Sequence, residues 1–225
     1  MMVTSSPYPT LGILTLDTET PLGEIRFKIP NLVVRRLYIE QIQSMLLPDD
    51  QEQMAGLQAA KELYATGDMQ PLCEFIERRY FKVFDNRDYR WAGEFTLKTI
   101  FLTLLFQDTF YLIDSEMDLA RGYADLTLIV RPERRQYPLL DIALEFKYIS
   151  LAEAGLDGET ARHLSHEELR DLPVMRDKLA EARSQLQRYR DALTERYGDT
   201  LRLRAYAVVA LGFERLVWDV AEAEP

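Results

Sequence analysis

Two charged residues stand close together in an otherwise apolar stretch of the chain. In the segment LLDIALEFKYI, Glu145 and Lys147 are two positions apart, and the residues around them are typical of a buried β-strand. Side chains two apart on a strand project from the same face, so the carboxylate and the ammonium group are expected side by side. Burying two charges is costly unless something offsets the cost. A mutual ion pair together with a bound cation would do so.

A second acidic residue, Asp125, lies in the preceding predicted strand, RGYADLTLIV. The turn between the two strands is of modest length, and antiparallel pairing of neighbours would bring the carboxylate of Asp125 beside that of Glu145. Mg²⁺ is commonly bound by one or two carboxylates and keeps several of its waters. The two acids therefore predict a site for Mg²⁺ or Mn²⁺, with Lys147 next to it.

These motifs resemble the PD-(D/E)XK nuclease superfamily. The similarity rests on GYAD, which ends at Asp125, then a hairpin, and then Glu145-Phe-Lys147. The resemblance implies that Asp125 and Glu145 hold the metal and that the carbonyl group of Phe146 joins them. It also implies that Lys147 orients the attacking water or helps to deprotonate it. E-x-K by itself is common by chance and also describes an ordinary surface ion pair.

Two further parts of the family pattern occur in the expected order. Glu94, in GEFTLKTIF, matches an acidic residue on the helix before the sheet, where the resemblance lets it bind the metal through water or support a second ion. Gln185 and Tyr189, in EARSQLQRY, match a Gln and a Tyr on a later helix, and Gln185 would position the water or a neighbouring backbone group. A solvated helix residue is an equally good interpretation of Glu94. Tyr189 fits the apolar stripe of its helix better than a catalytic role.

The resemblance continues towards the N-terminus. LGILTLD and then FKIPNLVVRRLY resemble a segment of a large bacterial branch of the superfamily, in which the nuclease domain follows a predicted AAA-type ATPase domain. The chain has no G-x-x-x-x-G-K-[ST] motif, so the resemblance implies an AAA-type ATPase partner or a missing domain. Residues 151–177 look longer than the usual connection of the family, and Tyr123 stands where that branch usually has Arg.

The elements that must position these residues predict an α/β fold. We expect a restriction-endonuclease-like mixed central sheet flanked by helices in residues 76–225, with 151–177 as an insertion, behind a hairpin and helices in residues 1–75. Hydrophobic periodicity and turn residues predict individual elements. The expected helices are 32–47, 54–67, 69–84, 94–106 and 178–197, the first with Asn31 as N-cap, and 86–93 is expected to be a loop. The expected strands are two short ones within 11–29, then 110–118, 121–130, 139–149, 201–213 and 215–220.

Composition limits the classes of function. The chain has 225 residues, of which 47% are hydrophobic and 28% charged, as in a globular protein with a full core. The formal net charge of −10 counts against a protein that coats nucleic acid non-specifically, but leaves room for one local site. Cys73 is the single cysteine, and we expect neither a secretory signal nor a membrane span. A cytoplasmic location is the simplest expectation.

Other polar residues have ordinary alternatives. His163 and His166 are spaced to share a helix face, but no third ligand suggests itself, so surface positions are expected. Two acidic residues lie near the site strands, and we leave their role open: Glu116 and Asp141, the latter on the same strand face as Glu145. Arginines are frequent in two places: Arg131, Arg134 and Arg135 in the turn between the two site strands, and Arg183, Arg188 and Arg190 on the helix of Gln185. They could form a phosphate-binding rim or be ordinary solvated charges.

Two functions from different classes fit these observations. The first is a Mg²⁺-dependent nuclease that hydrolyses phosphodiester bonds, with DNA as the expected nucleic acid and a homodimer as one way to cut both strands. The alternative is a non-catalytic interaction module with a nuclease-like fold that docks onto an ATPase partner or regulates it, which the negative net charge favours. Metal binding and cleavage discriminate between the two.

Overall fold

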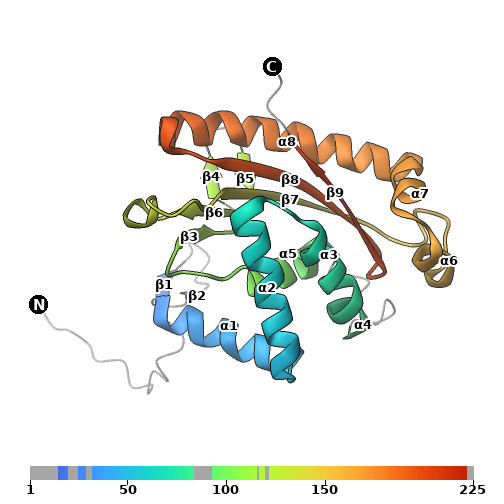
Figure 1. Ribbon diagram of the computed structural model, residues 1–225, viewed down its shortest axis with the longest axis horizontal. Coiled ribbons are helices and arrows are strands. Elements are labelled where there is room, and N and C mark those ends of the chain that lie inside the picture. The colour runs from blue at the N-terminus through green and yellow to red at the C-terminus, as the bar shows by residue number, and fades with distance from the viewer. Residues whose placement is uncertain are drawn as a thin grey trace, which may run out of the picture.

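The structure is a computed structural model, and it describes residues 15–19, 25–28, 32–83, 93–115, 117–119 and 122–221. Its centre is a five-stranded sheet between two layers of helices (Figure 1). No helix in these described ranges is both long and apolar enough to cross a membrane.

The central sheet is mixed, with the strand order β3-β6-β7-β8-β9. Its strands are β3 (Tyr111–Asp114), β6 (Leu126–Val130), β7 (Asp141–Ile149), β8 (Leu203–Leu211) and β9 (Arg215–Val220). Strands β7 and β8 are parallel, and all other neighbours in the sheet are antiparallel. Parallel neighbours need a long crossover, and here it contains the longest helix of the described chain, α8 (Pro173–Tyr197). The predicted mixed α/β architecture is confirmed.

Each face of the sheet is covered by its own helices. Helix α8 runs along one face, and α2 (Asp50–Thr66) and α5 (Gly93–Leu104) lie on the other (Figure 1). Strand β7 alternates between the two layers: Leu144 and Phe146 belong to the apolar cluster that contains residues of α2 and α5, whereas Ala143 packs with α8. Because both faces are buried, β7 is almost continuously apolar, as its sequence indicates.

The remaining elements are short, apart from one helix near the N-terminus. They are β1 (Thr15–Glu19), β2 (Ile25–Lys28), α1 (Leu32–Leu46), α3 (Gln70–Phe75), the π-helical turn η1 (Ile76–Tyr80), α4 (Phe81–Val83), β4 (Met117–Leu119), β5 (Gly122–Ala124), the 3₁₀ turns η2 (Pro132–Arg134) and η3 (Gly198–Thr200), α6 (Gly158–His163) and α7 (His166–Asp171). Leu63 of α2 and Phe75 of α3 belong to the same apolar cluster as Phe146. The domain boundary at residues 75 and 76 stays a prediction.

Two of the predicted strands were wrong in extent. The expected strands 110–118 and 121–130 are each divided, into β3 and β4 and into β5 and β6, and β4 and β5 form a separate two-stranded sheet. The second division falls at Asp125. Its side chain accepts the hydrogen bond of the Phe146 N–H, which would pair with the neighbouring strand if that strand continued. Hydrophobic alternation cannot predict that a side chain replaces a backbone hydrogen-bond partner, because alternation indicates only which side chains are buried.

The predicted helices need smaller corrections. The expected helix 69–84 is interrupted by the π-helical turn, and α8 begins at Pro173 rather than at Lys178. Within 151–177, α6 and α7 are present, and a capping box between Ser165 and Glu168 begins α7. Asn31, residues 86–92 of the expected loop and Glu116 lie outside the described residues, and Gly93, the last residue of the expected loop 86–93, begins α5 instead.

Candidate active site

The two predicted acids meet where the pairing of β6 with β7 ends. That pairing runs from Leu128 opposite Ile142 to Leu126 opposite Leu144, so Asp125 directly precedes the last paired residue. Instead of extending the ladder, Oδ2 of Asp125 accepts a hydrogen bond from the backbone N–H of Phe146 at 2.9 Å. The side chain of Asp125 thus fixes its carboxylate against the strand that carries Glu145.

The same contact orients the backbone of Phe146. The N–H and C=O of one strand residue project to the same side, as paired residues in an antiparallel ladder show by exchanging both of their hydrogen bonds. The Phe146 carbonyl is therefore directed to the side of β7 on which Asp125 lies. This carbonyl is the third metal ligand that the family resemblance implies.

Glu145 is buried and only partly satisfied. The residue is 3% exposed, and its Oε1 accepts a hydrogen bond from Nζ of Lys147 at 2.9 Å. Its Oε2 is buried and has no hydrogen-bond partner within the described part of the chain. Buried carboxylate oxygens are almost always paired, so an exception requires an explanation, and a role as a cation ligand is one of the few available.

The charges around the pair explain its protonation behaviour. Burial and then the charge of Asp125 raise the pKa of Glu145 to about 7, against the hydrogen bond and the positive charge of Lys147. Burial alone would lower the pKa of Lys147, but its hydrogen bond to Glu145 and the negative charges of Glu145, Glu94 and Glu181 raise it. Lys147 therefore stays protonated. Ionisation of Glu145 costs free energy unless a further cation binds next to it.

Helix α8 contributes side chains from above β7. Glu181 lies 3.9 Å from Lys147 Nζ through its Oε1, and Oε1 of Gln185 is buried without a hydrogen-bond partner in the described residues. Tyr189 is 4% exposed, and burial followed by the charges of Glu145 and Asp125 raises its pKa. Tyr189 thus belongs to the core, as predicted, but borders the site.

Helix α5 approaches the site from the opposite layer. Phe101 packs on Phe146, with 4.9 Å between the ring centroids, and a Cβ at Gly93 would lie 2.6 Å from Cδ1 of Tyr148. This close docking brings Glu94, which is exposed, near enough to raise the pKa of both Glu145 and Lys147. Whether Glu94 acts at a metal stays a prediction.

One residue at the site was not predicted. Nζ of Lys98 lies 3.7 Å from Oδ1 of Asp125, and its side chain is 13% exposed. Residues four apart on a helix share a face, so a helix that brings Glu94 to the site also brings Lys98. That spacing in GEFTLKTIF was the signal that could have identified it.

The donor set fits a small divalent cation with water ligands. No three His, Cys, Asp or Glu side chains of the described residues are close enough together to hold a metal, so Glu94 does not complete a three-acid cluster. Two carboxylates suffice for Mg²⁺, which retains several waters. Oε2 of Glu145 has no hydrogen-bond partner among the described residues and the pKa of this carboxyl is raised, so a cation bound there would stabilise its ionised form.

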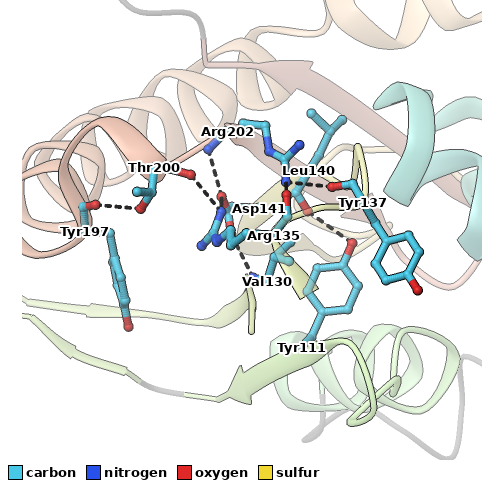
Figure 2. A network of polar contacts seen from close by, with 9 residues as sticks. All are labelled: Tyr111, Val130, Arg135, Tyr137, Leu140, Asp141, Tyr197, Thr200 and Arg202. Atoms are coloured by element: carbon cyan, nitrogen blue, oxygen red, sulfur yellow. Dashed lines mark hydrogen bonds and ion pairs between the residues drawn. The ribbon is translucent and has the colours of Figure 1, made fainter. Parts of the chain in front are cut away.

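Asp141, on the same strand face as Glu145, has a structural environment instead (Figure 2). It is 0% exposed, and its two oxygens accept hydrogen bonds from the backbone N–H groups of Val130 and Arg202 at 2.8 Å and from Nη1 of Arg135 at 2.6 Å. Glu145 is four positions further along the strand, a rise of roughly 13 Å. Asp141 therefore ties β6 and β8 to the start of β7, far from the site.

The other residues considered from the sequence have ordinary surroundings. His163 is exposed and contacts the Glu159 carbonyl, His166 packs edge-on to Trp218, and the Cys73 thiol is buried with a raised pKa. Five of the arginines in the turn and on α8 contact other groups of the chain: Arg131 the Asp108 carbonyl, Arg134 the Phe110 ring, Arg135 Asp141, Arg183 Asp219 and Arg190 the Ala221 carbonyl. Ordinary structural contacts therefore account for these five.

A comparison with protein families identifies the family of the segment that contains this site. The family model of the PD-(D/E)XK nuclease superfamily matches residues 92–218, which hold α5, α8 and the central sheet except for the last two residues of β9. The chain belongs to the PD-(D/E)XK nuclease superfamily. No curated protein and no solved structure matches the chain. The branch of the superfamily that is associated with AAA-type ATPases stays a prediction.

Proposed function

We propose that this PD-(D/E)XK protein is a metal-dependent nuclease that hydrolyses phosphodiester bonds, with DNA as the expected substrate. One observation carries the proposal: Glu145, beside Asp125 at the end of the β6–β7 pairing, keeps a buried carboxylate oxygen to which no described residue donates a hydrogen bond. A structural ion pair would satisfy both oxygens, as Asp141 does on the same strand. A metal ligand needs one oxygen left available.

Asp125, Glu145 and the carbonyl of Phe146 would hold Mg²⁺ or Mn²⁺. A divalent cation bound there supplies Lewis-acid chemistry, polarising a phosphoryl oxygen and lowering the pKa of a bound water. Glu145 is fixed by its strand, and the carboxylate of Asp125, just before β6, is fixed by its hydrogen bond from the Phe146 N–H, so both ligands are already in place in the folded chain. Glu94 would act on the same site through water from its position on α5.

Lys147 and Gln185 would handle the water and the developing charge. Lys147 is held protonated by Glu145, so its remaining N–H groups can donate to the attacking water or to a phosphoryl oxygen on which negative charge grows. The Oε1 of Gln185, buried and unpartnered among the described residues, can accept a hydrogen bond from that water and so orient it. Attack of the water oxygen at phosphorus would form one P–O bond while the bond to the leaving oxygen breaks. The water gives up a proton and the leaving oxygen takes one from solvent, which releases two nucleic-acid ends.

The test is cleavage of plasmid DNA, linear duplex, single-stranded DNA and RNA with Mg²⁺ or Mn²⁺. Asp125→Asn keeps an acceptor for the Phe146 N–H but removes a charged ligand, and Lys147→Met removes the ammonium group. We expect both to reduce cleavage by roughly 100-fold or more, while Asp199→Ala and Lys82→Ala, at exposed positions, leave it unchanged.

A wild-type protein that neither cuts any of these substrates nor binds Mn²⁺ in a calorimetric titration would contradict the nuclease proposal. The interaction module that docks onto an ATPase partner would then be the better account.

A further inference from the structure

Each of the two site carboxylates has its own lysine. Lys147 donates to Glu145 at 2.9 Å on the face of β7 that α8 covers, and Lys98 of α5 lies 3.7 Å from Asp125 on the other side. The paired charges therefore cancel before any metal arrives. Glu94 and Glu181, both exposed, add negative charge from the flanking helices.

The position of Lys98 conflicts with a metal at Asp125. Oδ2 of Asp125 is engaged by the Phe146 N–H, so Oδ1 is the oxygen best placed for a cation, and Oδ1 is the atom nearest to Nζ of Lys98. A dication there and the ammonium group would lie within a few ångströms of each other, in a partly buried place where repulsion is poorly screened. The ammonium group must therefore move, or the metal binds weakly.

We propose that Lys98 is a phosphate-binding residue that couples metal binding to substrate binding, an inference that rests on the proposed nuclease function. In the metal-free protein Lys98 neutralises Asp125. When a divalent cation takes Oδ1, the long side chain turns to a non-bridging oxygen of a nucleic-acid phosphate next to the site. The negative phosphodiester replaces Asp125 as the ionic partner of Lys98, so bound metal favours binding of nucleic acid and bound nucleic acid favours binding of metal.

The coupling has a definite thermodynamic form. If the phosphodiester raises the affinity for metal by some factor, the metal raises the affinity for nucleic acid by the same factor. A protein of this kind binds metal weakly when alone and fills its site only with substrate present. The negative charge of the whole chain, −10, makes such a local cation useful for holding a phosphate.

The experiment is a calorimetric titration of Mn²⁺ into the wild-type chain and Lys98→Met, with and without a phosphorothioate-linked DNA oligonucleotide that resists cleavage. Met keeps most of the length of the side chain without its charge. Without oligonucleotide we expect Lys98→Met to bind Mn²⁺ roughly ten-fold more tightly than wild type. The oligonucleotide should tighten binding by roughly ten-fold or more in wild type and by much less in the variant.

A damaged fold would lower the affinity of Lys98→Met, so the expected rise separates an electrostatic role from a structural one. Lys61→Met, at an exposed position on α2, is the matched control and should behave as wild type. Equal or weaker Mn²⁺ binding by Lys98→Met alone, or an equal gain from the oligonucleotide in both chains, would overturn the role of Lys98 and leave the nuclease proposal standing. If neither chain binds Mn²⁺ under any condition, the nuclease proposal itself fails.

Discussion

Replacing Glu145 with Gln should make the metal-free protein more stable at alkaline pH. The pKa of Glu145 is about 7 in the folded chain against an ordinary value of 4.5, because burial and Asp125 oppose its ionisation. A group whose folded pKa is raised contributes stability that is fully present below about pH 4.5 and is lost as the pH rises through about 7. Wild type therefore loses stability over this window, and a Gln at this position does not titrate.

The size of the effect follows from the shift. About 2.5 pKa units at 1.36 kcal/mol each give an upper limit of about 3 kcal/mol at pH 8. Lys147 loses a charged partner in the variant, although the amide oxygen can still accept its hydrogen bond, so we expect a net gain of roughly 1–3 kcal/mol. At pH 5 most of this gain should vanish, because the wild-type carboxyl is then largely protonated.

Urea unfolding in EDTA at pH 5 and pH 8 measures the difference directly. Glu195→Gln, at an exposed position on α8, is the control and should show no pH-dependent gain. Added Mn²⁺ should stabilise wild type and not Glu145→Gln, which reverses their order. A gain of the same size at both pH values, or no gain at pH 8, would refute the conclusion that ionised Glu145 is strained in the metal-free site.

Two further substitutions separate architecture from chemistry. Gly93→Ala places a Cβ against the ring of Tyr148, so it should lower the free energy of unfolding by about 1–3 kcal/mol. The substitution should also shift Glu94 and Lys98 and measurably reduce cleavage. An unchanged urea midpoint would mean that this contact is not tight. Asp141→Asn leaves three donors facing a neutral side chain in a fully buried place and should cost about 3 kcal/mol. Mn²⁺ affinity of the folded Asp141→Asn protein should stay at the wild-type value in calorimetry, and a large drop would place Asp141 in the site after all.

The sequence was sufficient to predict which residues of β7 share a face. Alternation puts Glu145 and Lys147 together, and the apolar residues between them predict a strand buried on both sides, as observed. The predicted proximity of Asp125 to Glu145 needed only antiparallel pairing of neighbouring strands, which is also present. Local periodicity therefore accounts for the centre of the site.

Tertiary contacts decided what the sequence left open. Asp141 and Glu145 are indistinguishable by strand parity, and only the donors contributed by Arg135, Val130 and Arg202 make the first structural. The bend at Asp125 depends on a hydrogen bond to Phe146, which no local pattern encodes. Lys98 was missed because a lysine on an amphipathic helix is ordinarily solvated, and its approach to Asp125 depends on how closely α5 docks at Gly93.

Because β6 begins only at Leu126, part of β7 has an unpaired edge inside the sheet. From Glu145 to Ile149, β7 pairs with β8 on one side, and none of the described strands continues the ladder on the other. An open, apolar strand edge is a template for pairing with another chain and hence for aggregation. The charged side chains at 145 and 147 and the carboxylate that caps the Phe146 N–H interrupt that edge. The groups that would perform the chemistry therefore also keep this gap from being filled by a foreign strand.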